Sequence, residues 1–235
     1  MSKAPANAPT YIRISDLIRK DIFAGAFVPG QRLKVLDLAE RYATSQMPIR
    51  EALHILQGEG LVQVLPNRGA VVQAINEKFL SDHYDMLKAI EMLLVRRAAE
   101  AVAPEAIPLI KGEADRFRKA ADKGETAACL RADKRFHNAI NRFSRNDLAL
   151  DFVERQSKVP DAQRLRVGYS SERLLQAAAE HDQLVEALSR NDGEGAARIM
   201  DVHLVGAKQD LFERLAETRD LRFGGYGSFG TTIAN

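Results

Sequence analysis

The sequence lacks tryptophan, and Phe, Tyr and Trp together supply only 6% of its 235 residues, so a core must rest on Leu, Ile, Val and Ala. Cys129 is the single cysteine, which excludes a disulfide within the chain and fits a reducing cytosol. No apolar run approaches the ~20 residues of a membrane span. The first ten residues also lack the apolar core of a secretory signal. We expect a cytoplasmic protein with no membrane partner.

The charge and hydrophobic content are ordinary for a globular protein, with 46% hydrophobic and 28% charged residues. Residues 1–75 hold nine Lys and Arg against six Asp and Glu, a net charge of +3, whereas residues 76–235 hold 25 against 26. The slight positive excess agrees with phosphate contact in the N-terminal third. Many domains that bind no nucleic acid carry as much.

The pattern along the chain predicts two folded domains of a mainly α protein. Residues 1–9, rich in Ala, Pro and Asn, are expected to form a disordered tail. Residues 10–75 form the first domain, residues 76–79 a linker, and residues 80–220 an all-helical second domain. Residues 221–235 hold four glycines and are expected to be a flexible tail.

The first domain shows three amphipathic helices followed by a β-hairpin. Apolar residues recur at helical spacing in three stripes: Ile14, Leu17, Ile18 and Ile22; Val35, Leu38, Ala39 and Tyr42; Ile49, Ala52, Leu53 and Leu56. Residues 61–65 and 70–75 are β-branched runs that flank a Pro-Asn-Arg-Gly turn. This order is typical of a winged helix-turn-helix, with the short turn at Ala43-Thr44.

In a helix-turn-helix, the N-terminal end of the third helix enters the major groove of DNA. Here that end begins at Ser45, with Gln46 and Arg50 able to reach phosphates or base edges. We assign to DNA binding Lys34, Ser45, Gln46, Arg50 and the wing residues Asn67, Arg68 and Gly69. The alternative is a three-helix domain with an exposed hairpin and no DNA role, and composition alone leaves the two interpretations open.

The same stretch resembles the GntR family of bacterial repressors. The resemblance covers about 65 residues and rests on GAFVPGQRL (25–33), LAERY (38–42) and SQMPIREALHILQGEGLVQVLPNRGAVV (45–72). It implies that Met47 also meets DNA. Gln46 and Met47 stand where the family commonly has Arg and Thr, and Val35-Leu36 where it often has Glu-Arg. We therefore expect an operator that differs from the usual consensus.

Three histidines of the second domain occupy core-facing positions on three different helices. His137 shares a face with Asp133, Phe136 and Ile140; His181 and His203 lie on the apolar stripes of later helices. Burying such polar groups alone costs a few kcal/mol. Their common placement suggests that they meet as metal ligands: Asp133, His137, His181 and His203.

Zinc is the first candidate metal for a set of one Asp and three His, with nickel, manganese or iron as alternatives. A lone inward histidine is more often a satisfied core residue, and Asp133 with His137 alone is more often an i,i+4 ion pair. The combination of four groups favours the metal.

The second domain resembles the FCD ligand-binding domain of the FadR branch of the GntR family. The resemblance covers roughly residues 80–215 and rests on DKRFH (133–137), EH (180–181) and NDGEGAARIMDVHL (191–204). It implies an antiparallel bundle of six or seven helices, a metal on the four residues above, a small organic acid as effector, and a homodimer on a palindromic operator. Leu87 replaces an Arg that commonly faces the effector. Lys88 and Asn141 are therefore our effector-binding candidates, although Asn141 would equally suit a solvated surface.

Three functions compete at this stage. The first is a metabolite-responsive repressor, in which ligand binding at the metal changes the spacing of two DNA-reading domains. The second is a metalloenzyme in a helical bundle, which lacks an obvious general base and needs no winged helix. The third is a DNA-binding protein whose metal is purely structural. We expect the first, with no enzymatic activity.

Overall fold

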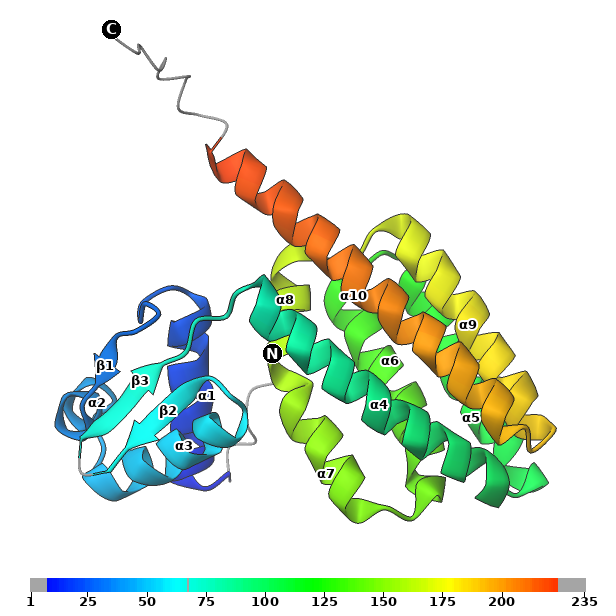
Figure 1. Ribbon diagram of the computed structural model, residues 1–235, viewed down its shortest axis with the longest axis horizontal. Coiled ribbons are helices and arrows are strands. Elements are labelled where there is room, and N and C mark those ends of the chain that lie inside the picture. Colours follow the sequence, from blue (N-terminus) through cyan, green and yellow to red (C-terminus); the bar gives the residue numbers. More distant parts are fainter. Residues whose placement is uncertain (1–7, 67, 224–235) are drawn as a thin grey trace, which may run out of the picture.

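The computed structural model describes residues 8–66 and 68–223. A small N-terminal domain with a β-sheet lies beside a longer, all-helical domain (Figure 1). This architecture confirms the predicted fold class, a winged helix-turn-helix followed by an antiparallel helical bundle. Residues 1–7 of the predicted N-terminal tail lie outside the described residues.

The N-terminal domain is built from three helices whose apolar stripes meet in one core. The helices are α1 (Thr10–Phe23), α2 (Val35–Arg41) and α3 (Gln46–Gly58). The predicted stripes are largely buried, with Ile18, Ile49 and Leu56 at 0% exposure. Ala43, in the turn between α2 and α3, takes a left-handed φ of 49°. That turn sets α3 across α2, as a helix-turn-helix requires.

A small antiparallel sheet completes the N-terminal domain. The predicted hairpin forms as β2 (Val62–Leu65) and β3 (Gly69–Val72), with Val62 opposite Val72 and Leu65 opposite Gly69. β3 also pairs with β1 (Arg32–Leu33), so the strand order within the described residues is β1-β3-β2. The sequence analysis missed β1 because two residues are too few to show strand alternation.

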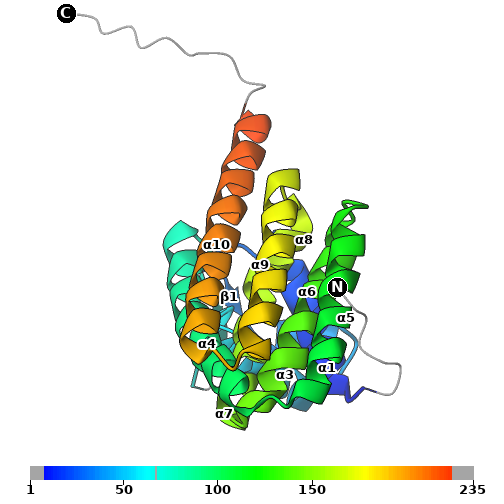
Figure 2. The same cartoon turned by 90° about the vertical axis from the view of Figure 1, so that its right-hand side faces the viewer.

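The helical domain contains seven α-helices within the described residues, which agrees with the expected six or seven. They are α4 (Glu77–Ala101), α5 (Ile107–Ala121), α6 (Thr126–Asn141), α7 (Asp147–Gln156), α8 (Lys158–Val167), α9 (Ser171–Ser189) and α10 (Gly193–Phe223). Short 3₁₀ turns at Pro104–Ala106 and Arg142–Ser144 join some of them. α4 and α10 run along each other in opposite directions, and α5 packs on α6 and α9 (Figures 1 and 2).

Two predicted boundaries were wrong. The linker at 76–79 is instead the first turn of α4, because the Asn76 side chain caps this helix by accepting from the backbone N–H of Phe79 at 2.9 Å. The C-terminal tail was expected from residue 221, but α10 continues through Phe223, since the glycines begin only at residue 224. Residues 224–235 lie outside the described part. No helix in the described ranges is long and apolar enough to cross a membrane.

Candidate metal centre and nucleic-acid interface

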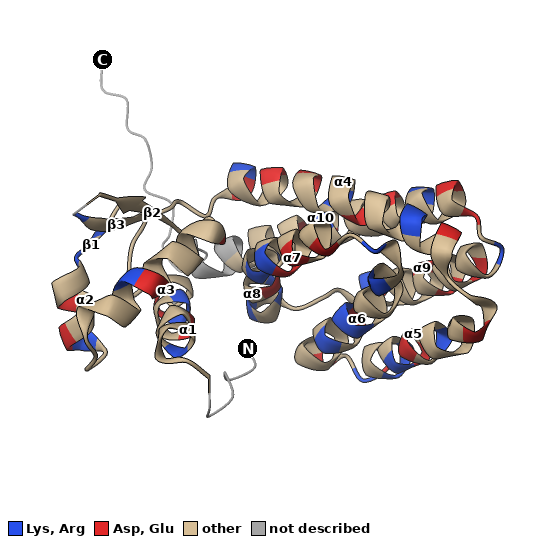
Figure 3. Cartoon of the chain, turned by 90° about the horizontal axis from the view of Figure 1, so that it is seen from below, with Lys and Arg blue, Asp and Glu red and all other residues tan. Residues whose placement is uncertain are grey.

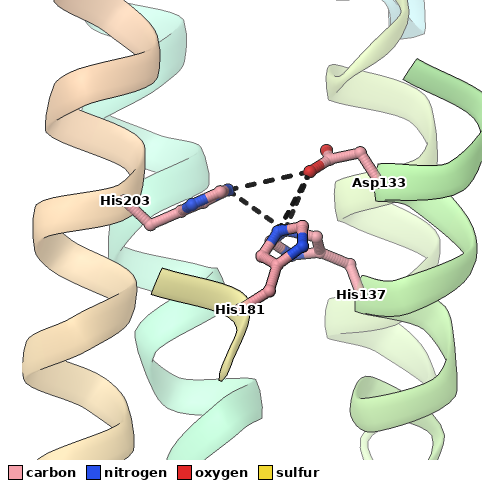
Figure 4. A group of neighbouring side chains, drawn as sticks. All are labelled: Asp133, His137, His181 and His203. Atoms are coloured by element: carbon pink, nitrogen blue, oxygen red, sulfur yellow. Dashed lines mark hydrogen bonds and ion pairs between the residues drawn. The ribbon is translucent and has the colours of Figure 1, made fainter. Parts of the chain in front are cut away.

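The four predicted metal ligands meet inside the helical domain. α6 carries Asp133 and His137 one turn apart on one face, α9 supplies His181 and α10 supplies His203 (Figure 4). Asp133 Oδ1 lies 3.3 Å from Nε2 of His181 and 3.8 Å from Nε2 of both His137 and His203. One ligand atom from each residue fits within 4.8 Å of all the others. Three helices therefore aim four donor atoms at one point.

Burial and mutual charge set the protonation of these groups. Burial alone would raise the pKa of Asp133, but the charge of His137 and contact with His181 hold it well below its usual range. Burial lowers the pKa of His181 to about 4 and also lowers that of His203, so both imidazoles are neutral near pH 7. Burial opposes charge on His137 too, yet Asp133 and Glu91 raise its pKa to about 9. A metal would have to displace one proton, from His137.

A carboxylate fixes the orientation of His203. Its Nδ1 lies 2.7 Å from Glu180 Oε2, and with the proton on Nδ1 the lone pair of Nε2 faces the centre. Arg173, buried at 3% exposure, donates to both oxygens of Glu180 at 3.0 and 2.7 Å and to the His203 carbonyl at 3.0 Å. Burial would raise the pKa of Glu180, but the hydrogen bonds from His203 and Arg173 lower it to about 2. Glu180 is thus ionised and able to hold the ring.

His137 has a similar arrangement with a looser contact. Its Nδ1 lies 3.6 Å from Glu91 Oε2, beyond a hydrogen bond but within ion-pair range. Asn141 donates to the same Glu91 oxygen at 2.7 Å. Glu91 and Asn141 are both buried, so this pair forms a polar wall next to the centre.

His181 is held by aromatic rings. It is fully buried, stacks on Phe136 with ring centroids 4.0 Å apart, and meets the edge of Phe117 at 4.5 Å. Among the described residues, both of its ring nitrogens and Nδ1 of His137 are buried without a hydrogen-bond partner. An unsatisfied buried group costs about 1–3 kcal/mol. A cation at the centre would satisfy Nε2 of His181, so the residues present fit a borderline first-row metal ion.

The metal centre opens onto a cavity of about 530 Å³. Asn141 lines it, as predicted for an effector-binding residue, and so does Leu87. Lys88 does not line this cavity: its Nζ pairs with Asp201 at 2.9 Å, between α4 and α10. Consecutive residues on a helix point about 100° apart, so the buried face that holds Leu87 excludes its neighbour. The assignment of Lys88 to effector binding is therefore withdrawn.

Several polar residues of this cavity were missed by the sequence analysis. Arg173 lines the cavity, and its partner Glu180 stands seven residues away on the same face of α9, beyond the i,i+3 and i,i+4 spacings that mark helical ion pairs. Arg164, at 3% exposure, pairs with Asp210 of α10 and lies over the ring of Tyr169 at 4.3 Å. No local pattern distinguishes such a buried arginine from an exposed one.

The second candidate site is the exposed N-terminal end of α3. Ser45, Gln46, Met47 and Arg50 are all exposed there, whereas Ile49 is fully buried in the core. Ser45 occupies the N-cap position without a side-chain cap hydrogen bond. The polar end of the helix is therefore turned outward and its hydroxyl is free of a capping contact, as the predicted DNA contact requires.

The wing lies next to this helix end. Arg68 is exposed, and its carbonyl accepts from Arg32 Nε at 2.9 Å, which adds an exposed arginine that the sequence analysis missed. Lys34 is exposed at the N-cap of α2. Gly69 has a φ of +85°, and a Cβ on it would lie 2.0 Å from the Leu33 carbonyl oxygen. Gly69 is thus needed for strand packing, and the predicted contact of Asn67 lies outside the described residues.

Charge alone does not mark a nucleic-acid face. Lys, Arg, Asp and Glu are spread over both domains (Figure 3). Arg50 and Gly69 line one groove between α3 and the wing, of about 420 Å³. The assignment of a DNA interface therefore depends on the exposed helix end, the wing and the groove between them.

Models of two protein families match this chain, one in each domain. The model described as bacterial regulatory proteins, gntR family, matches residues 10–72, and the FCD domain model matches residues 82–206, more than half of the chain.

Relatives and solved structures agree with these matches. The chain is 27% identical to the HTH-type transcriptional repressor RspR of Escherichia coli over 218 residues, which cover 90% of this chain and 91% of the relative. It is 29% identical to the E. coli repressor GlaR over 80% of this chain and 89% of that protein. The structure of E. coli McbR/YncC matches with a TM-score of 0.67 at 19% identity, over 88% of this chain and 99% of that one. Because the matched proteins are regulators, the metalloenzyme hypothesis is set aside. The chain belongs to the GntR family of bacterial regulatory proteins and is a DNA-binding transcriptional regulator with an FCD domain.

Proposed function

We propose that the chain is a repressor whose affinity for its operator is set by a small organic acid bound at a divalent metal in the helical domain. The observation that carries this proposal is the convergence of Asp133, His137, His181 and His203 at a cavity of about 530 Å³. Zinc is our first candidate for the ion, with nickel, manganese or iron as alternatives. The relatives RspR and GlaR are named repressors, which supports the sign of regulation.

The cavity suggests how the effector is recognised. A carboxylate of the ligand would complete the coordination of the metal, since oxygen ligands suit such a centre. Asn141, in the polar wall next to Glu91, would accept hydrogen bonds from hydroxyl groups of the ligand, because its Oδ1 is buried without a partner among the described residues. Leu87 is apolar where an arginine is common, so the acid would be attracted by the metal together with other cations of the cavity wall, such as Arg142 and Arg173.

We further propose a homodimer that binds a palindromic operator in the cytoplasm. A pair of two-fold related α3 helices would place their exposed ends, with Gln46, Met47 and Arg50, in successive major grooves. Lys34, Ser45, Arg68 and the backbone at Gly69 would hold the phosphates on either side. Asn67 stays a prediction from the sequence.

The first test is the metal content of purified wild type and His181→Ala, measured by inductively coupled plasma mass spectrometry after growth without added metal. We expect about one equivalent per chain in wild type and its loss in the variant. If wild type binds no metal even after incubation with zinc, nickel and manganese, the metal centre is refuted and the histidines line a metal-free pocket.

The second test links the metal to DNA. DNA selected from a random-sequence pool by the wild-type protein would be titrated with the zinc-loaded protein while organic acids are added. We expect one class of acid to weaken DNA binding in wild type and to have no effect on His181→Ala. If zinc stabilises the protein but no acid changes DNA binding, the metal is structural.

A further inference from the structure

Helix α8 takes part in both domains. Its first residue, Lys158, extends Nζ to Glu59 Oε1 at 2.8 Å, and Glu59 is fully buried directly after α3. The next residue, Val159, is also fully buried and belongs to the hydrophobic core of the N-terminal domain. Within two turns the same helix lines the metal-side cavity through Asp161 and Arg164.

The contact at Glu59 is positioned to affect the DNA-reading helix. Arg19 of α1 donates to both oxygens of Glu59 at 2.7 Å and also pairs with Asp16, so the partly exposed Lys158 joins a cluster of four charged side chains. Gln156, at the end of α7, donates to the Gly58 carbonyl at 2.8 Å. The C-terminal end of the recognition helix α3 is therefore held by two residues of the helical domain. Figure 3 shows α8 on the side of the helical domain that lies toward α3.

At its other end α8 is tied to the helices that carry the metal ligands. Asp161 pairs with Lys134 of α6, which directly follows the metal-binding aspartate. Arg164 pairs with Asp210 of α10 and donates to the Ala207 carbonyl at 2.7 Å, one turn beyond the metal-binding histidine of that helix. A change in the position or rigidity of α6 or α10 is thus passed to α8 through these contacts.

We infer that α8 is a relay: it transmits a change at the metal centre to the DNA-binding domain. The Lys158–Glu59 contact is the point at which this change reaches α3. This inference rests on the proposed function, since the input is occupancy of the metal centre. Arg19 is shared between Glu59 and Asp16, so the positive charge of Lys158 balances the second carboxylate, and this charge comes from the other domain. Because Lys158 belongs to the other domain, its contact makes the C-terminal end of α3 sensitive to the position of α8.

The test is hydrogen–deuterium exchange by mass spectrometry on the full chain, metal-free and loaded with zinc. It compares wild type, Lys158→Met and the matched control Lys88→Met, which removes the same charge from an ion pair within the helical domain. Zinc should slow exchange in residues 50–62 of wild type and Lys88→Met by roughly twofold to fivefold, the scale of one partly exposed ion pair. In Lys158→Met that slowing should vanish, while α6, α9 and α10 remain protected by zinc.

The outcomes separate the relay from the metal centre. If zinc protects α6, α9 and α10 but residues 50–62 do not respond, or respond equally in Lys158→Met, the relay is refuted and the metal centre stands. If zinc changes exchange nowhere, the metal centre fails and the relay loses its input. Should Lys158→Met fold poorly in the metal-free state, Lys158→Gln replaces it with the same expected result.

Discussion

The proposed DNA-contact surface and the proposed metal centre of this regulator differ in burial: the first is exposed and the second lies inside the helical domain. At the N-terminal end of α3, Gln46, Met47 and Arg50 are exposed, and the partner proposed for them, DNA, lies outside the protein. At the proposed metal centre, His181 and His203 are buried at 0% and 4% exposure and their neighbours are other side chains of the same domain. Exposed contact residues can be substituted without disturbing the fold, so the preferred operator sequence can change while the structure is kept. A change at the buried residues disturbs the fold, because each of them is packed among neighbours of its own domain.

At the wing, a residue of the exposed surface is constrained by packing: Gly69 lies against the backbone of Leu33. We expect Gly69→Ala to destabilise the N-terminal domain by about 2–4 kcal/mol, because φ is +85° and the new Cβ would lie 2.0 Å from a backbone oxygen. Urea unfolding followed by circular dichroism measures the loss. Gly112→Ala is the matched control: nothing lies within 4 Å of its Cβ position in α5, so it should stabilise by up to ~1 kcal/mol. Equal effects of the two substitutions would contradict the strand contact.

If the α3 end is a true contact surface, Arg50→Ala should weaken DNA binding without touching stability. Loss of one arginine contact to a base or phosphate is expected to cost about 1–3 kcal/mol, while the unfolding midpoint stays within error because Arg50 is exposed. Fluorescence anisotropy with the DNA selected by wild type provides the affinity. Arg190→Ala, an exposed arginine at the end of α9, is the control that should leave DNA binding unchanged. An unchanged affinity in Arg50→Ala would remove this residue from the interface.

The difference between the sites also explains what the sequence could predict. The apolar spacing of Ile49, Leu53 and Leu56 is a local signal, so the helix-turn-helix and its outward-facing end were predictable from α3 itself. The cluster of Asp133 and three histidines was predictable for a related reason: a histidine such as His203 on an apolar stripe is costly to bury without a polar partner. Their actual meeting at one point depends on how three helices pack, and it was an inference from the residues that the structure supports.

Residues that depend on tertiary contacts alone were not predictable. Lys88 and Leu87 are neighbours in sequence, yet only Leu87 faces the cavity, because the register of α4 against α10 decides which residue is buried. Arg164 and Arg173 have the same local appearance as surface arginines, and only their distant partners bury them. β1 exists because β3 offers it an edge, which two residues of sequence cannot reveal.

A residue that contacts a proposed metal ligand, but not the metal itself, provides a further test of the buried site. Glu180→Gln keeps the size of the side chain and removes the charge that orients His203. We expect zinc affinity to fall by roughly 10- to 100-fold, the usual effect of losing such a partner. The variant should also be less stable, because buried Arg173 loses its counter-charge, so affinity is measured well below the unfolding temperature. Competition with a zinc chelator measures the affinity. Glu186→Gln, an exposed glutamate of the same helix paired with Arg190, should have no effect. If Glu180→Gln binds zinc as wild type does, the buried groups are not interdependent in the way proposed here.

The last expected effect, at most about tenfold for each pH unit, is a dependence of zinc affinity on pH that only the buried site should show. Asp133 and Glu91 raise the pKa of His137 to about 9, so the metal-free protein carries a proton on this ring below that pH. Zinc needs the lone pair, and the proton must leave when the metal binds. Affinity should therefore rise by up to about tenfold per pH unit from pH 7 to pH 9, then level off. Chelator competition at each pH measures this, and Glu91→Gln should lower the pH at which affinity levels off, because it removes one of the charges that hold the proton. An affinity that stays flat between pH 7 and pH 9 would mean that His137 is already neutral, and the electrostatic interdependence of the centre would be weaker than its geometry indicates.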